Sequence, residues 1–143
     1  MTLFEALTAA RQRIDRLDAR LLLQYATGCS HTDLLARPET PVSAPACAQF
    51  AEWVARRAAG EPLAYIVGEV EFHGRVFQVS PAVLIPRPET EVLIDLALEK
   101  LAGLANPKIL DLGTGSGIVA ISLALKCPRA AVVAVDLSLE AIS

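Results

Sequence analysis

The segment Ile109–Gly117 constrains the fold of this chain more than any other part of the sequence. It opens with a short, largely apolar run that ends at a glycine, as expected for a strand in a buried parallel sheet. Alternating glycines then allow the backbone to turn sharply, because glycine reaches positive φ at little cost. A helical pattern over Ile118–Lys126 follows, and a second apolar run ends at Asp136. This order of strand, glycine turn, helix, strand and carboxylate predicts an α/β fold with a parallel sheet.

The spacing of the glycines distinguishes between cofactors. The dinucleotide motif G-x-G-x-x-G requires glycine where this chain has Ile118. The observed G-x-G-x-G, with Asp111 two residues before the first glycine, resembles motif I of class I S-adenosylmethionine-dependent methyltransferases. Asp136 lies 19 residues after Gly117, where a carboxylate can accept both ribose hydroxyls. The N-terminal amides of the following helix favour a negatively charged group of the ligand. The remaining interpretation is a purely structural glycine turn followed by a surface aspartate.

Residues 1–67 are predicted to be entirely helical. Apolar residues recur at steps of three and four and form one amphipathic stripe: Leu3, Leu7, Ala10, Ile14, Leu17 and Leu21. Gly28 is expected to end this helix as a left-handed cap, and a short helix over 32–36 stops before Pro38. Ser43 is expected to cap a longer helix through Ala59, with Phe50, Trp53 and Val54 inward. The stripe indicates a small helical core, and a docking face for a partner is an open alternative.

The character of the sequence changes at Gly68. Two β-prone runs, 67–72 and 75–79, flank His73-Gly74 and predict a hairpin. A proline-stiffened loop follows, and Pro88 suits the first turn of a helix. That helix is expected to place these apolar residues on one face: Val92, Leu93, Leu96, Ala97 and Leu101. The predicted organisation is a helical domain over 1–67, a hairpin linker over 68–80, and an incomplete methyltransferase domain over 81–143.

Composition excludes several classes of function. Hydrophobic residues make up 53% of the chain, yet no apolar run is long enough to span a membrane. The net charge is −3, without the basic excess that direct nucleic-acid binding requires. Three widely spaced cysteines fit neither a disulfide framework nor a zinc site, so we expect no metal and a cytoplasmic protein. We also expect a monomer. Arginines near the N-terminus could belong to a transit peptide, but the acidic residues among them favour an ordinary amphipathic helix.

Several blocks of the sequence resemble the HemK/PrmC family, which methylates a glutamine side chain in peptide chain release factors. The blocks are Gly60–Gly68, Glu71-Phe72, Phe77–Val79, Leu84–Glu91 and Ile109–Gly117. The glycine block is shared by many methyltransferases. The combination of G-E-P-x-A-Y-I with I-P-R-P-E-T-E is much more specific, and the order of blocks matches along essentially the whole chain.

The resemblance implies S-adenosylmethionine as cofactor and peptide chain release factors as protein substrates. In the family the glycine loop contacts the methionine part of the cofactor, which here implies Gly113, Thr114, Gly115, Ser116 and Gly117. The carboxylate after the second strand, Asp136, would bind the ribose, and Asp111 would hold the turn. Arg87 and Thr90 lie in a loop that is near the cofactor in the family, although a plain linker is an equal alternative. The helical domain is similar to the one that helps to recognise the release factor.

The chain departs from the family in one respect. The catalytic Asn-Pro-Pro-Tyr motif of the family is absent, and the sole asparagine is Asn106, so no catalytic residue is assigned. We expect an N-terminal portion, truncated before that motif and inactive alone. Two alternatives stay open, namely a non-catalytic fragment that docks a release factor, and a related methyltransferase acting on another protein glutamine or a nucleic acid base. A dehydrogenase ranks last because the glycine spacing does not fit one.

Overall fold

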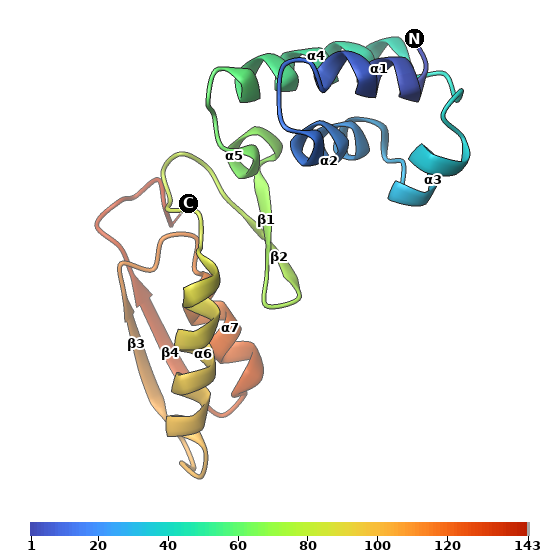
Figure 1. Cartoon of the computed structure of the whole chain (residues 1–143). Helices are drawn as coiled ribbons and strands as arrows, with labels where there is room; N and C mark the ends of the chain where they lie inside the picture. Colours follow the sequence, from blue (N-terminus) through green and yellow to red (C-terminus); the bar gives the residue numbers. More distant parts are fainter. Residues whose placement is uncertain (143) are drawn as a thin grey trace. The chain divides into compact units, whose positions relative to one another are not determined.

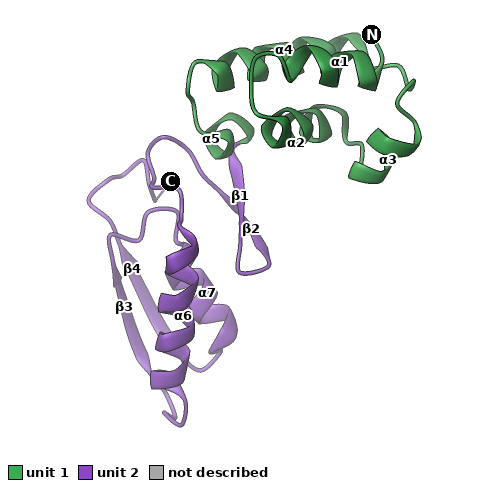
Figure 2. Ribbon diagram, viewed as in Figure 1, with its two compact units in different colours: residues 1–67 green, residues 68–143 purple. Residues whose placement is uncertain are grey.

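The computed structural model describes residues 1–142 and divides them into two compact units. The first unit covers residues 1–67, and the second begins at residue 68 (Figure 2). Each unit has its own cluster of buried apolar side chains. None of the helices described within residues 1–142 is long and apolar enough to cross a membrane.

The first unit is built from helices alone (Figure 1). They are α1 (Leu3–Ala10), α2 (Arg16–Thr27), α3 (His31–Ala36), α4 (Ala44–Ala58) and α5 (Leu63–Val67). Side-chain caps fix where four of these helices begin: Thr2 for α1, Asp15 for α2, Ser30 for α3 and Ser43 for α4. Gly28 ends α2 with φ of 71°, which confirms the predicted left-handed cap.

The prediction of one continuous stripe from Leu3 to Leu21 was wrong. The chain leaves the helix after Ala10 and restarts at Asp15, whose Oδ1 accepts the amide of Leu17 at 2.7 Å. Because the second helix starts in a new phase, Leu17 turns outward and is 50% exposed. Apolar spacing alone does not reveal such a break, since the turn preserves the recurrence of apolar residues.

The core of the first unit forms where α1, α2 and α4 meet. Its buried members include Leu22 and Leu23, which are fully excluded from solvent, and Phe50 and Val54 from α4. Trp53 is partly buried and packs against the same cluster. The inward face predicted for α4 is therefore confirmed. All buried members of this core lie between residues 3 and 66, so the first unit closes its core without help from the second.

The second unit begins with a hairpin and continues as an α/β arrangement. Its elements are β1 (Glu69–Phe72), β2 (Arg75–Gln78), α6 (Pro88–Leu101), β3 (Lys108–Leu112), α7 (Ile118–Lys126) and β4 (Ala131–Val135). Strands β1 and β2 pair antiparallel, and His73 and Gly74 both take positive φ in the turn between them. Phe72 and Phe77 point into the second core, where their rings meet edge to face. The hairpin is thus packed into the second unit.

Strands β3 and β4 pair in parallel, with α7 as the crossover between them. Residues Ile109 and Val132 are register partners, as are Leu110 and Val133. This strand–helix–strand arrangement, together with the helical unit and the hairpin, confirms the predicted fold class. It is the beginning of a Rossmann-like parallel sheet.

The face that helix α6 buries shares only Ala97 and Leu101 with the one predicted. Ile94 is fully buried, and Ala97, Leu98 and Leu101 pack against the second core, but Val92, Leu93 and Leu96 are more than half exposed. The helix has apolar residues on opposite sides, so periodicity alone cannot select the buried face. Packing against α7 and Ile109 decides it.

One face of the parallel strand pair carries apolar side chains that are open to solvent. Alternation along each strand puts Ile109 and Val132 on the face that packs toward the helices. The opposite face consists of Leu110, Leu112, Val133 and Val135, each of them at least 42% exposed. An exposed apolar face of this kind normally marks a surface that another element or partner covers.

Candidate cofactor-binding site

The glycine turn joins β3 to α7 and returns the chain across the end of β4. All three glycines are left-handed, with φ of 74° at Gly113, 55° at Gly115 and 74° at Gly117. The amides of Gly113 and Thr114 both donate to the carbonyl of Val135, at 2.8 and 3.0 Å. The turn is therefore anchored to the neighbouring strand through its backbone, and side chains other than hydrogen would be strained at the three glycine positions.

Asp136 closes the loop from the other strand. Its Oδ2 accepts the amide of Gly115 at 2.8 Å, and its Oδ1 accepts the amide of Ser138 at 2.9 Å. These hydrogen bonds, that from Ser138 first and that from Gly115 second, lower the pKa of the Asp136 carboxyl below its ordinary value of 3.8. Asp136 is thus a fixed negative charge that lies at the glycine turn at neutral pH.

Asp111 holds the turn from within. Its Oδ2 accepts two hydrogen bonds, from the hydroxyl of Thr114 at 2.8 Å and from the amide of Ala120 at 3.2 Å. Gly117 occupies the N-cap of α7 and has no side chain with which to cap it. Asp111 therefore supplies the missing acceptor for an amide in the first turn of α7, from nine residues upstream. The sequence predicts that the N-terminal amides of α7 face a ligand. The amide of Ala120 is instead bonded to Asp111 inside the protein.

The predicted cofactor-binding residues are distributed as follows. Gly115 and Asp136 are in direct contact, while the side chain of Thr114 is engaged by Asp111. Ser116 lies on the side of the loop facing the hairpin, where it lines a hollow of about 620 Å³ together with Gln78 of β2 and others. Gly113 has open space around its α-carbon, with no atom within 4 Å of where a methyl group would stand.

Comparison with known proteins places this chain in a family. Residues 3–68 match the PrmC N-terminal domain, and residues 89–143 match the methyltransferase small domain. A release factor glutamine methyltransferase of Burkholderia pseudomallei is 50% identical over 90% of this chain and 45% of its own length. The corresponding enzyme of Bordetella pertussis is 48% identical over 100% of this chain and 53% of its own length.

The chain belongs to the release factor glutamine methyltransferase family. It spans about half the length of the curated relatives that it matches. A crystal structure of a release factor-specific protein-(glutamine-N5) methyltransferase from Alicyclobacillus acidocaldarius shares 47% identity, with a TM-score of 0.35 over 46% of this chain and 43% of that one.

The I-P-R-P-E-T-E block, which the resemblance to the family singled out, leads into α6. Arg87 is the N-cap of the helix without a side-chain cap bond, Pro88 is its first residue, and the amide of Thr90 donates to the carbonyl of Arg87. The last acid of the block, Glu91, accepts the amide of His73 at 3.0 Å and so fixes the hairpin turn to α6. Just upstream, Val83 Cβ lies 3.8 Å from where a methyl group on Gly115 would stand. The segment before α6 is therefore next to the glycine turn.

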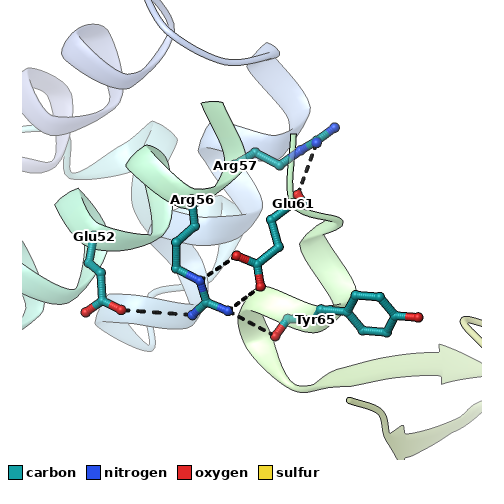
Figure 3. A network of polar contacts seen from close by, with 5 residues as sticks. All are labelled: Glu52, Arg56, Arg57, Glu61 and Tyr65. Carbon is teal, nitrogen blue, oxygen red and sulfur yellow. Dashed lines mark hydrogen bonds and ion pairs between the residues drawn. The ribbon is translucent and has the colours of Figure 1, made fainter. Parts of the chain in front are cut away.

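The second family block, G-E-P-x-A-Y-I, has a structural role in the first unit (Figure 3). The Arg56 guanidinium donates to both carboxylate oxygens of Glu61 and to the carbonyl of Tyr65, and Arg57 donates to the carbonyl of Glu61 (Figure 3). The hydrogen bond from Arg56 lowers the pKa of Glu61, and the same bond raises the pKa of Arg56. This bidentate pair ties the end of α4 to α5.

The sequence did not indicate the roles of Arg56 and Arg57, because the turn between α4 and α5 determines which groups they contact. It also missed the long-range pair in which Arg57 Nε donates to Asp18 Oδ2 at 2.6 Å and joins α4 to α2. A sequence signal existed only for Glu61, which lies in the G-E-P-x-A-Y-I block that the resemblance to the family singled out. No pattern in α2 or α4 pointed to the Asp18–Arg57 pair.

Proposed function

We propose that this chain provides the cofactor site and the substrate-recognition unit of an enzyme that methylates peptide chain release factors. The methyl acceptor is the side-chain nitrogen of the glutamine in the Gly-Gly-Gln motif, and S-adenosylmethionine is the methyl donor. The observation that carries this proposal is the left-handed glycine turn closed by Asp136, in a chain of this family. The free cysteines suit a reducing compartment, and we place the protein in the cytoplasm as a monomer that acts in translation termination.

The residues present fit the nucleoside end of this cofactor. An ionised carboxylate offers about four lone-pair positions. The amides of Gly115 and Ser138 donate to different oxygens of Asp136, so each oxygen keeps a lone pair with which it would accept a ribose hydroxyl. The lowered pKa of Asp136 keeps it an acceptor at neutral pH. Hydrogen bonds to a charged carboxylate are stronger than hydrogen bonds between neutral groups, so Asp136 would be the main anchor for the ribose.

The loop residues would hold the methionine end through their backbone. The amides of Gly113 and Gly115 already donate to Val135 and Asp136, so these glycines would offer their carbonyl oxygens and a close approach without Cβ atoms, with open space around Gly113. Thr114 and Ser116 would also act through their main-chain carbonyls, because the Thr114 amide and hydroxyl already donate to Val135 and Asp111, and Ser116 lies on the hairpin side. Gly117 completes the set by permitting the tight entry into α7. When bound, the cofactor supplies a methyl group on a positively charged sulfur.

The acceptor determines what else the enzyme must do. A glutamine amide nitrogen is a weak nucleophile, so the rate must come from holding it in line with the methyl group and from hydrogen bonds that favour the attacking form. We assign no residue of this chain to that transfer step. The helical unit contributes instead to binding the release factor, and its separate core provides a rigid surface for that purpose.

The cofactor site is tested by titrating S-adenosylmethionine into the chain in a calorimeter. Asp136→Asn keeps the size of the side chain but removes its charge, and we expect affinity to fall by about tenfold or more, in line with hydrogen bonds to charged groups. Glu99→Gln is the matched control, because Glu99 is an exposed carboxylate of the same unit on α6. Equal affinity of the wild type and Asp136→Asn would refute the assignment of the ribose anchor.

The reaction is tested with a chain of the relatives' length, purified release factor and methyl-labelled cofactor. We expect label on the glutamine of the Gly-Gly-Gln motif and its loss in Asp136→Asn but not in Glu99→Gln. A labelled ribosomal protein or nucleic acid in place of the release factor would overturn the proposed substrate.

A further inference from the structure

A pocket of about 300 Å³ lies on the first unit, between α2 and α3 and beside the end of α1. Three arginines line it, namely Arg11 at the C-cap of α1 and Arg16 and Arg20 on α2. His31, the first residue of α3, completes the polar part of the wall. No carboxylate is among the lining residues.

The positive charge of this pocket arises from the way the unit uses its acids. Residues 1–67 contain seven basic and seven acidic side chains, so the unit as a whole is neutral. Almost all of the acids are engaged elsewhere, in helix caps or in ion pairs with Arg56 and Arg57. They are Glu5, Asp15 and Asp33 in caps, and Asp18, Glu52 and Glu61 in pairs. The arginines of the pocket are therefore left without carboxylate partners among the described residues.

Arg20 shows that the pocket lacks an acceptor. Its Nε is buried and has no hydrogen-bond partner within the described part of the chain. Its Nη1 lies 3.3 Å from Nε2 of His31. A guanidinium has five donors and normally satisfies them with planar, bidentate acceptors such as a carboxylate. No carboxylate of the pocket lining therefore balances the Arg20 guanidinium, and a carboxylate from outside the unit would supply the negative charge that the pocket lacks.

The rim of the same pocket is apolar. Leu17 on α2 is 50% exposed and Leu35 on α3 is 71% exposed, although both belong to helices of the core unit. We propose that this pocket binds an acidic segment of a polypeptide partner, with carboxylates on the arginines and an apolar side chain against these leucines. This inference rests on the proposed function, according to which the acidic segment belongs to the release factor. Nucleic acid is the less favoured occupant, because exposed leucines offer nothing to phosphates and the unit has no net positive charge.

The test measures binding of a purified release factor to the full chain by biolayer interferometry. The informative variant is Arg11→Ala/Arg16→Ala. The matched control is Arg13→Ala/Arg37→Ala, which removes the same charge from exposed arginines of the same unit that do not line this pocket. We expect the first variant to weaken binding by about tenfold or more and the second by about twofold or less, since only the first loses specific charge-assisted contacts. Cofactor titration should be unchanged in both variants.

A second probe separates this inference from the proposed function. It is a short peptide of alternating glutamate and leucine, with a glutamine–leucine peptide as its uncharged control, observed by chemical-shift changes at the Arg20 and His31 side chains. Release-factor binding that survives Arg11→Ala/Arg16→Ala would overturn the pocket and leave the function intact. Absence of release-factor binding, with pocket shifts from the acidic peptide alone, would support the pocket and overturn the partner. Stronger binding of an RNA oligonucleotide than of the acidic peptide would overturn the choice of a polypeptide.

Discussion

Asp111 allows a quantitative test of how the glycine turn is held. A single oxygen, Oδ2, accepts both the Thr114 hydroxyl and the Ala120 amide. Asp111→Ala removes both bonds. The lost cap of α7 costs about 1 kcal/mol, and the lost hydrogen bond from the hydroxyl to a charged group costs about 1.5 kcal/mol. The sum of about 2.5 kcal/mol corresponds to a roughly 60-fold increase in the opening of α7.

Two further variants separate the components. Asp111→Asn keeps one acceptor oxygen and loses only the charge, so we expect a cost of about 1 kcal/mol or less and an increase of about fivefold or less. Thr114→Val removes the hydroxyl bond alone and keeps the cap, so its effect should fall between those of the other two variants. A structural role limited to filling space would instead leave Asp111→Asn and Thr114→Val at the wild-type value, because both substitutions keep the size of the side chain.

Amide hydrogen exchange of the peptide over residues 118–126 is the appropriate assay. The sole tryptophan, Trp53, and both tyrosines lie in the first unit, so intrinsic fluorescence does not report on α7. That same fluorescence provides the control, because the urea transition of the first unit should be unchanged in all three variants. Unaltered exchange of α7 in Asp111→Ala, under conditions in which the wild-type helix is protected, would refute the capping role.

Other perturbations have equally definite outcomes. Asp15→Ala removes the cap of α2 and should lower the unfolding free energy of the first unit by about 1 kcal/mol, followed by Trp53 fluorescence in urea. Gly117→Ala should destabilise the second unit by about 1–2 kcal/mol, because φ is 74° and the new methyl would stand 3.0 Å from Ile121 Cδ1; an unchanged circular dichroism melt would contradict this. Since the pKa of Asp136 is lowered in the folded state, its stabilisation is complete above pH 3.8 and is lost as the pH falls through the folded value. The difference in unfolding free energy between the wild type and Asp136→Asn should therefore shrink below pH 3.8.

The local elements could be predicted where one residue type determines the backbone. Gly28 had to be a left-handed cap, Ser43 a helix start, and His73-Gly74 a hairpin turn, because few residues suit those conformations. The strand, turn and helix over residues 109–126 were predictable for the same reason, since alternating glycines exclude regular structure at that point.

The elements that were predicted wrongly depend on which of two similar surfaces is buried. The break between α1 and α2 requires Asp15 to cap a helix in the middle of an apolar stripe, and the stripe looks the same with or without the break. Helix α6 has apolar residues on opposite sides, so the burial of Ile94 and not of Leu93 is decided by α7. The bond from Ala120 to Asp111 likewise arises only once the turn has folded. The sequence indicated that Asp111 and the start of α7 flank the same glycine turn, but it did not indicate the hydrogen bond between Asp111 and Ala120.

The self-contained core of residues 3–66 has a consequence for how the chain is made. Ribosomes add about 5–20 residues per second, so the 76 residues from 68 to 143 take roughly 4–15 seconds to follow the first unit. Helical domains dominated by local contacts fold in microseconds to milliseconds. The helical unit can therefore be native at the tunnel exit before β3 and β4 exist as a pair. During synthesis, the exposed leucines and valines of that strand pair emerge behind a finished domain instead of beside an unfolded one.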